Sequence, residues 1–469
     1  MNTTLSNSKP HCRIFYILPF IILAEGFVSI ATEILTIRQL LPVAGGSVVV
    51  TSLVIGVFLL FLALGYQRGG KHSENFQYIL RRNFFVSAIW LGIGLSYIFV
   101  ATFFYFLQQF FGFHIIYPLI AYLLVIIAPL IYLLGQTVPI TMNMVKQNRP
   151  AGLIGGDTLG LSTIGSFLGA ILTTIIFMYY FGVAWTVFFN FMVLILLSFW
   201  LIETKFSLLL QLCFSIAVIW IAYHCNIKME HTLFNLTNQY ANYQIVNGQD
   251  LKLQDNEKML VINNAASSLI DKNKKGFQYI ELIKKILFND LKLRNTEILV
   301  LGAGGFSLSA ENSYGNQFTY VDIDKQIKKI TVPDFIPEMN NHLIIDDARH
   351  YLNVTKKKYP AIVVDVYSDI KSIPAYLISE EYILKIREHL SENGIAIFNI
   401  VAKPMLADPY SKHIDNTIRS VFSNCMSIPL RYSDKQTNIL YVCYHSMRSD
   451  DKKIYSDNLN NSTIDAFTW

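Results

Sequence analysis

The sequence predicts two parts of different class: a multi-pass α-helical membrane bundle in residues 1–228, followed by an α/β domain in residues 229–469. The chain is 53% hydrophobic, too apolar for one soluble domain of 469 residues, and the apolar excess lies in the N-terminal half. From about residue 229 short apolar runs alternate with charged helical segments. One of these runs begins at Ile298 and leads into a glycine turn, which is typical of a nucleoside-binding sheet.

Seven segments in the first part approach the roughly 20 apolar residues that cross a bilayer. They are residues 14–36, 47–66, 84–108, 114–134, 152–180, 183–202 and 205–223. Lys9 and Arg13 precede the first segment, and the loops after the second and fourth segments are basic, so the positive-inside rule predicts a cytoplasmic N-terminus. Seven crossings would then place the C-terminal half outside, where nucleoside cofactors are scarce. Because residues 205–223 form the weakest segment, we predict an integral membrane protein with a cytoplasmic C-terminal half.

Charge separates the two parts as well. Residues 1–228 hold 11 of the 38 Lys and Arg and 5 of the 33 Asp and Glu, which gives this part a net charge of +6 and the remainder −1. The basic excess is therefore typical of membrane topology and gives no case for a nucleic-acid partner.

Three acidic residues lie within the predicted spans: Glu25, Glu33 and Asp157. Ionisable groups in hydrocarbon are costly and usually face the bundle interior, so each is a functional candidate. Alternatively, Glu33 pairs with Arg38 near a helix end, and Asp157 lies at the membrane interface.

Small residues and cysteines indicate packing rather than chemistry. The pairs Gly156/Gly160 and Gly165/Gly169 have the four-residue spacing of closely packed membrane helices. The five cysteines show no CxxC pair and no metal-ligand spacing, so we expect reduced, buried thiols and no metal site.

The second part is predicted to be an α/β parallel sheet with a small β appendage before it. The predicted strands are near 243–246, 259–262, 298–301, 318–323, 361–364, 395–400 and 439–444, and the helices near 276–288, 379–390 and 411–422. We divide this part into the β appendage (229–270), the nucleoside-binding sheet (271–444) and a polar tail (445–469) with no assigned function.

Acidic residues follow successive strands of the predicted sheet. Asp322 follows the second main strand, Asp346 and Asp347 follow Leu343–Ile345, and Asp365 follows residues 361–364. Open α/β sheets bind ligands at the carboxyl ends of their strands, so these acids could contact ribose hydroxyls, an adenine amine and an attacking nucleophile in turn. The alternative is that they are solvated loop caps.

The order of these motifs resembles the spermidine synthase (polyamine aminopropyltransferase) family. The motifs are GAGG, VDID, DDARHYL, YPAIVVDVYSD and IPAYLISEEYILKIREHLSENGIAIFNI, with Tyr243-Gln244 and FQYIE upstream. The stretches EGFVSIATEILTIRQLL and GDTLGLSTIGSFLGA resemble the membrane half of bacterial fused members. The resemblance implies a Rossmann-like, methyltransferase-type sheet, a bacterial inner-membrane location, and pairing into homodimers.

The resemblance also implies site residues. Donor-binding positions are Gly302 and Gly304 at the nucleoside, Asp322 at the ribose, Asp346 and Asp347 at the adenine, and Gln244 near the donor. Asp365 matches the acid that deprotonates the attacking amine, and Tyr279 and Asp369 match substrate-binding positions. The implied donor is decarboxylated S-adenosylmethionine and the implied acceptor a diamine such as putrescine.

The glycine loop departs from the family pattern GGGDGG. The aligned stretch here is GAGGFS, which places Gly305 at the acidic position and Phe306 at the next glycine. Three hypotheses therefore remain: a membrane-anchored aminopropyltransferase, another S-adenosylmethionine-dependent transferase, or a non-enzymatic nucleoside- or polyamine-binding domain that regulates a membrane transporter.

Overall fold

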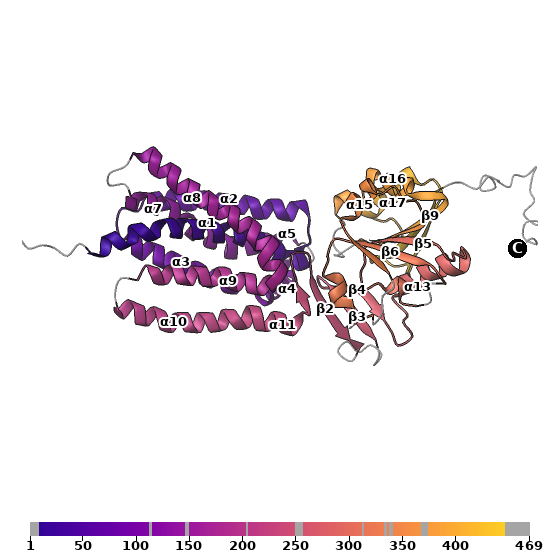
Figure 1. Ribbon diagram of the computed structural model, residues 1–469, viewed down its shortest axis with the longest axis horizontal. Coiled ribbons are helices and arrows are strands. Elements are labelled where there is room, and N and C mark those ends of the chain that lie inside the picture. Colours follow the sequence, from indigo (N-terminus) through magenta and orange to yellow (C-terminus); the bar gives the residue numbers. More distant parts are fainter. Residues whose placement is uncertain are drawn as a thin grey trace, which may run out of the picture. The chain divides into compact units, whose positions relative to one another are not determined.

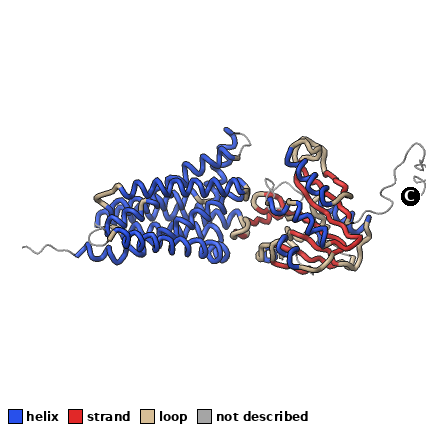
Figure 2. Tube along the Cα trace, turned by 90° about the horizontal axis from the view of Figure 1, so that it is seen from above, coloured by secondary structure: helices blue, strands red, loops and turns tan. Residues whose placement is uncertain are grey.

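The computed structural model describes residues 9–111, 115–145, 150–202, 205–248, 257–311, 314–332, 335–336, 341–366 and 374–445. They divide into two compact units: Met1–Ile245 with Val261–Ala266, and Val246–Leu260 with Ser267–Trp469. Helices dominate the first unit, whereas the second combines strands and helices (Figure 2). The helical region continues through Leu233, beyond the change of sequence pattern near residue 229.

The first unit is a bundle in which most of the long helices run roughly along one direction (Figure 1). Its helices are α1 (Lys9–Ala44), α2 (Val48–Gly70), α3 (Phe76–Gly94), α4 (Tyr97–Phe111), α5 (Ile116–Tyr122), η1 (Leu123–Ile127), α6 (Ala128–Gly135), α7 (Thr137–Val145), α8 (Ala151–Ile171), η2 (Leu172–Phe177), α9 (Met178–Trp200), α10 (Lys205–Tyr223), η3 (His224–Lys228) and α11 (Met229–Leu233). Here η1 to η3 are π-helical turns that join consecutive α-helices.

Five helices among the described residues are long and apolar enough to cross a membrane: Ile17–Ala44, Val48–Gly70, Ile116–Val145, Ala151–Trp200 and Gln211–Leu233. A sixth candidate is the pair Phe76–Gly94 and Tyr97–Phe110, which is bent by 70°. The sequence predicted seven segments, one more than these six candidates. The difference arises because two predicted segments, residues 152–180 and 183–202, lie in the single 50-residue stretch Ala151–Trp200.

That stretch is broken at Gly182, whose φ of 83° is not helical. A straight helix of 50 residues would be about 75 Å long, against about 30 Å of hydrocarbon. The amides that the break exposes are satisfied locally: Val183 N–H donates to Thr237 Oγ1 (2.9 Å), and Ala184 N–H donates to the Glu230 carboxylate (2.9 Å). The break at Gly182 is therefore stabilised by hydrogen bonds to the side chains of Thr237 and Glu230.

Helices α1 and α8 approach each other closely. A Cβ added at Gly165 or Gly169 would overlap the carbonyl oxygens of Leu23 and Phe27, and Gly26 lies equally close to Ser162. The predicted packing role of Gly165 and Gly169 is therefore observed. It is wrong for Gly156 and Gly160, which face open space, because they lie on the other side of the same helix.

Two charged residues of α1, Glu25 and Arg38, have polar partners. The buried Glu25 carboxylate accepts hydrogen bonds from Ser29 Oγ (2.7 Å) and Ser162 Oγ (3.4 Å). The Arg38 guanidinium donates hydrogen bonds to Asn238 O and Asn242 Oδ1, both at 2.6 Å. Arg38 thus connects α1 to the segment that follows α11.

The strands form two sheets. A four-stranded sheet has the order β1 (Leu236–Thr237), β2 (Asn242–Asn247), β3 (Lys258–Ile262) and β4 (Ala265–Ile270). A seven-stranded sheet has the order β10-β11-β9-β8-β5-β6-β7. Its strands are β5 (Glu297–Leu301), β6 (Gln317–Asp322), β7 (His342–Ile345), β8 (Tyr359–Val364), β9 (Leu390–Ala402), β10 (Cys425–Pro429) and β11 (Thr437–Tyr444).

The large sheet is mixed, which corrects the predicted parallel sheet. Strands β5 to β9 pair in parallel, whereas β11 pairs antiparallel to β9 and β10 antiparallel to β11. Because β10 and β11 are neighbours along the chain, a short connection suffices and no crossover helix is needed. The sequence prediction did not include β10.

Helices cover the sheet and complete its core. They are α13 (Gln278–Lys284), η4 (Lys285–Asp290), η5 (Ser307–Ser309), α14 (Ile327–Thr331), α15 (Ala348–Val354), η6 (Ala375–Leu377), α16 (Glu380–Glu388) and α17 (Pro409–Val421). Helices α15, α16 and α17 gather beside the sheet (Figure 1), and their apolar side chains form one buried cluster with strands β5, β6, β8, β9 and β11. This packing fixes the strand ends that carry the candidate site.

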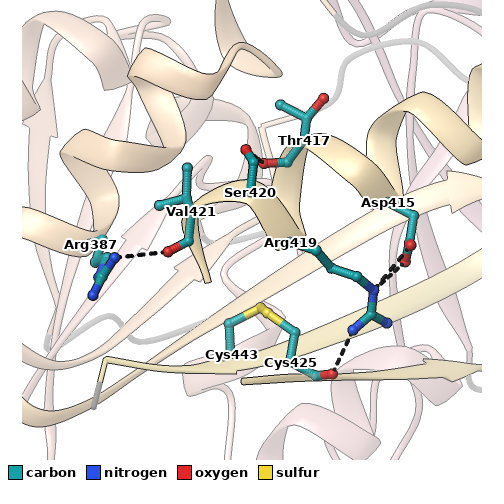
Figure 3. The surroundings of a disulfide bond; sticks show 8 residues. All are labelled: Arg387, Asp415, Thr417, Arg419, Ser420, Val421, Cys425 and Cys443. Atoms are coloured by element: carbon teal, nitrogen blue, oxygen red, sulfur yellow. Dashed lines mark hydrogen bonds and ion pairs between the residues drawn. A yellow bond between two sulfur atoms is a disulfide. The ribbon is translucent and has the colours of Figure 1, made fainter. Parts of the chain in front are cut away.

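A disulfide joins Cys425 to Cys443 across β10 and β11 (Figure 3). The two residues are directly opposite in the antiparallel register, with Cα atoms 4.1 Å apart. Arg419, which pairs with Asp415, donates to the Cys425 carbonyl oxygen at 3.0 Å. The prediction of reduced thiols is wrong for this pair, because only the pairing of β10 with β11 makes the two residues neighbours.

Candidate functional site

The predicted glycine turn follows strand β5. Gly302 and Gly304 have φ angles of 91° and 49°, and Gly302 N–H donates to Val321 O at 2.8 Å. A Cβ at Gly302 would overlap the carbonyl oxygen of Asp365 at the end of β8. The turn and Asp365 are therefore in direct backbone contact, as we expect for adjacent parallel strands.

Asp322 at the end of β6 fixes this turn. Its carboxylate accepts from Ala303 N–H and from Asp324 N–H, each at 2.9 Å. Burial raises the pKa of Asp322, and the two backbone hydrogen bonds oppose that rise. Asp322 thus stands beside the glycine turn, where the predicted ribose contact requires it, and also stabilises the turn itself.

Asp365 lies at the end of β8 between two neutral donors. Tyr279 Oη donates to Oδ2 at 3.0 Å, and Asn399 Nδ2 donates to Oδ1 at 2.9 Å. Burial raises the pKa of Asp365, whereas both hydrogen bonds lower it. Burial, followed by the Asp365 charge, raises the pKa of Tyr279. The structure therefore brings together two predicted residues, Asp365 and Tyr279.

Asp346 and Asp347 follow β7 and are engaged in local contacts. Asp347 caps α15 by accepting from the amides of Arg349 and His350 (both 2.9 Å), and it also accepts from Tyr376 Oη at 3.2 Å. Asp346 contacts His350 Nδ1 at 2.8 Å. Asp347 therefore does cap a helix, through Oδ1, while its Oδ2 accepts the hydrogen bond from Tyr376.

Gly305 stands at the loop position where the family has an acidic residue, and side chains of other segments occupy the space beside it. Gly305 N–H donates to Ser268 Oγ at 2.8 Å, and a Cβ at Gly305 would overlap the ring of Phe335 and lie 2.8 Å from Ser268 Cβ. Phe306 is fully buried and its ring packs edge-on against Tyr320, with centroids 4.9 Å apart. Phe306 therefore belongs to the core, and an acidic side chain at Gly305 would require Phe335 to move.

Two predicted residues remain. Gln244 lies in β2 within the first unit, whereas the residues above all belong to the second. Asp369 lies outside the described residues.

Sequence reasoning missed Asn399, Ser268 and Tyr376. Asn399 had a detectable signal, because it is the only polar residue in the apolar run Ile395–Val401 of a predicted central strand. Ser268 and Tyr376 had none, since each reaches the site from a segment distant in sequence.

The site contains several carboxyl groups, and their described partners are not cationic Lys or Arg side chains. Within the described part of the chain, the ion pairs of Lys and Arg involve none of Asp322, Asp347 and Asp365. The partners of Asp365 are a phenol and an amide, which carry no charge. A cationic ligand would supply the missing positive charge.

Comparison with known families finds a match within the second unit. Residues 276–440 match the family described as "Spermine/spermidine synthase domain". The C-terminal region carries a spermine/spermidine synthase domain. The matched residues span the spermine/spermidine synthase domain from the helix of Tyr279 to strand β11, and thus include the glycine turn and Asp365.

Curated relatives are similar in this region. A "Probable polyamine aminopropyl transferase" of Bifidobacterium longum is 27% identical over 221 residues, which cover 45% of this chain and 48% of the relative. The polyamine aminopropyltransferases of Vibrio vulnificus and Saccharolobus solfataricus are 29% and 28% identical over 155 residues, or 31% of this chain and 49% and 51% of theirs. The chain thus spans about half the length of the curated relatives it matches.

Solved structures that match part of this chain include a probable spermidine synthase from Corynebacterium glutamicum, with a TM-score of 0.38 and 18% identity over 49% of this chain and 83% of that one. The spermidine synthase of Thermotoga maritima has a TM-score of 0.33 and 15% identity over 47% of this chain and 79% of that one.

Proposed function

We propose that this protein is a membrane-anchored aminopropyltransferase. It would transfer an aminopropyl group from decarboxylated S-adenosylmethionine to a diamine such as putrescine. One observation carries the proposal: Asp365 lies beside the glycine turn, between the neutral donors Tyr279 and Asn399. The matched domain and the names of the relatives support the same reaction class.

Both proposed substrates are cations, and the charge of the site favours them. The donor carries a sulfonium and an ammonium, and the diamine carries two ammonium groups. Asp322, Asp347 and Asp365 form no ion pair with a described Lys or Arg. Binding a cation therefore removes an electrostatic cost that the free site bears.

The reaction needs one base. The diamine ammonium has no lone pair, so it must lose a proton before it attacks, and the Asp365 carboxylate would accept that proton. The amine nitrogen then bonds to the methylene carbon beside the sulfonium. The carbon–sulfur bond breaks, its electron pair stays on sulfur, and neutral methylthioadenosine leaves. The remaining task of the protein is to hold the two partners in line.

Donor contacts are proposed for the other residues. Gly302 and Gly304 would lie against the nucleoside, Asp322 would accept from the ribose hydroxyls, and Asp346 and Asp347 would face the adenine. Gln244 and Asp369 remain predicted contacts of donor and substrate. Tyr279 would line the amine site, since its hydroxyl already contacts Asp365.

The test uses the full chain in detergent or nanodiscs. Putrescine is supplied with either decarboxylated or intact S-adenosylmethionine, and methylthioadenosine and S-adenosylhomocysteine are quantified. We expect methylthioadenosine from the decarboxylated donor only, and its loss in Asp365→Asn, which preserves shape but not basicity. S-adenosylhomocysteine would instead indicate another S-adenosylmethionine-dependent transferase. Donor binding without any product would refute both enzymatic hypotheses.

A non-enzymatic binding domain that regulates a transporter is the second candidate, and two observations favour it. Phe335 fills the space beside Gly305 in which the family places an acid. The Cys425–Cys443 disulfide is typical of an oxidising compartment, where nucleoside donors are scarce.

We propose a bacterial inner-membrane location with the second unit in the cytoplasm, where such donors are made, and the apolar helices support membrane insertion. A reporter fused after Trp469 tests the orientation. A periplasmic result would favour the second candidate. Homodimer formation is likewise proposed and is measurable by light scattering with detergent correction.

A further inference from the structure

The carboxylate of Asp365 is the end of a chain of hydrogen bonds that crosses three strands. Asn399 on β9 donates to Asp365 Oδ1 at 2.9 Å, and Asn438 on β11 donates to Asn399 Oδ1 at 2.9 Å. Asn399 is 3% exposed, so its amide has little access to water. No part of the reaction described above requires Asn399 or Asn438 to contact a substrate.

The sheet register explains why the three residues meet. Strands β8 and β9 pair in parallel with Val364 opposite Phe398, so the next residues, Asp365 and Asn399, are also neighbours. Strand β11 pairs antiparallel to β9 with Leu440 opposite Asn399, so Asn438 is the diagonal neighbour on the same face. The antiparallel strand thus reaches the carboxyl ends of the parallel strands.

Each amide has a defined orientation in this chain. An ionised carboxylate only accepts hydrogen bonds, so Asn399 must turn its NH₂ group toward Asp365. Its oxygen then faces Asn438, which must donate in turn. The chain therefore holds Asp365 through Oδ1 alone, and it requires Asn438 to be a donor.

We propose that Asn399 and Asn438 form a relay that positions Asp365, holding Oδ1 so that Oδ2 accepts the proton of the incoming amine. Oδ2 is the oxygen that faces Tyr279, which the family resemblance places at the amine site. The inference rests on the proposed function, because it concerns how the base of that reaction is held. Asn399 and Asn438 are positioning residues, and neither contacts the reacting atoms.

The relay also affects the pKa of Asp365. The hydrogen bond from Asn399 lowers the pKa of Asp365, against the larger effect of burial. Its removal therefore raises that pKa further and shifts the acid limb of the pH–rate profile to higher pH. A residue that only packs the sheet would change stability without moving this limb.

The experiment compares four variants of the full chain: Asn399→Leu, Asn438→Leu, Asn438→Asp and Thr437→Val. Asn438→Asp keeps the shape but replaces the donor with an acceptor, so it turns the Asn399 oxygen toward Asp365. Thr437→Val is the matched control, because its side chain points to the opposite face of β11. Rates of methylthioadenosine formation are measured from acid to alkaline pH.

We expect Asn399→Leu and Asn438→Asp to lower kcat roughly 10- to 100-fold, the effect of losing a charge-assisted hydrogen bond, with little change in KM. Their acid limbs move to higher pH. Asn438→Leu has a smaller effect in the same direction, and Thr437→Val leaves the profile unchanged. Unaltered acid limbs in Asn399→Leu and Asn438→Asp would overturn the inference.

A second measurement separates this inference from the proposed function. The carboxyl infrared band that disappears in Asp365→Asn is titrated in wild type, Asn399→Leu and Asn438→Asp without substrate. If wild type shows no turnover, the proposed function fails, and the infrared titration still decides the relay. A band that titrates at the same pH in all three proteins would refute it.

Discussion

Replacing Gly302 with alanine tests whether the turn and Asp365 are packed as closely as the structure indicates. Gly302 has a φ of 91°, where a residue with a Cβ costs roughly 1–2 kcal/mol. The new Cβ would overlap the carbonyl oxygen of Asp365 and lie 3.2 Å from Val366 Cα. Backbone atoms cannot rotate away, so forced movement adds about 1–3 kcal/mol. We therefore expect a loss of about 2–5 kcal/mol of local stability.

Gly304→Ala is the matched control. Its φ of 49° imposes similar strain, but the neighbours of the new Cβ are the hydroxyls of Ser268 (3.1 Å) and Ser267 (3.6 Å), which can rotate. We expect a loss of about 1–2 kcal/mol there.

Native-state hydrogen exchange of the full chain in detergent reports these losses locally. The relevant amides are Gly302 N–H, bonded to Val321 O, and Asp365 N–H, bonded to Leu301 O, both at 2.8 Å. Protection of both amides should fall most in Gly302→Ala. A loss in Gly302→Ala below about 0.5 kcal/mol, or one no larger than in Gly304→Ala, would refute the reasoning.

Three further predictions follow from named contacts. Because burial raises the pKa of Asp365, the rate of aminopropyl transfer should rise with pH through a pKa higher than that of an ordinary aspartate. The same shift contributes to the free energy of unfolding: the contribution is complete below the pKa of Asp365 in the unfolded chain and is lost as pH rises through its pKa in the folded protein. Hydrogen exchange measured across this pH range would detect the loss. Reducing the disulfide between Cys425 and Cys443, which are 18 residues apart, should lower the stability of β10 and β11 by about 3 kcal/mol, so their amides should exchange faster after reduction. Mass spectrometry of the alkylated, unreduced protein should show two cysteines without an alkyl label. Alkylation of every cysteine without reduction would contradict the prediction. Arg38→Met keeps most of the side-chain length but loses both hydrogen bonds to Asn238 and Asn242, so the bundle should lose about 2–3 kcal/mol in a detergent melt; an unchanged midpoint would show that these bonds contribute little.

Composition and periodicity alone determined much of the architecture. Apolar segments predicted the helical first unit, and short β-branched runs predicted five of the seven strands of the large sheet, β5, β6, β8, β9 and β11. The sequence also predicted that Asp322 and Asp365 lie at the strand ends beside the glycine turn, because parallel strands bring their carboxyl ends to one edge of the sheet. These are local or topological regularities, and a single sequence carries them.

Tertiary structure decided the contacts between distant residues. Asn399 lies 34 residues from Asp365, and Asn438 a further 39 residues away, so the relay depends on strand order and on the antiparallel pairing of β11. The same pairing creates the Cys425–Cys443 disulfide, where sequence reasoning expected free thiols.

The glycine turn shows both contributions. The sequence was sufficient to locate it at the end of a strand and to recognise that Gly305 replaces an acid of the family. Only the folded chain reveals that Phe335 and Ser268 fill the space beside Gly305, since neither is near it in sequence. Side-chain packing is set by the whole fold, so no local pattern could have specified which residues close this part of the site.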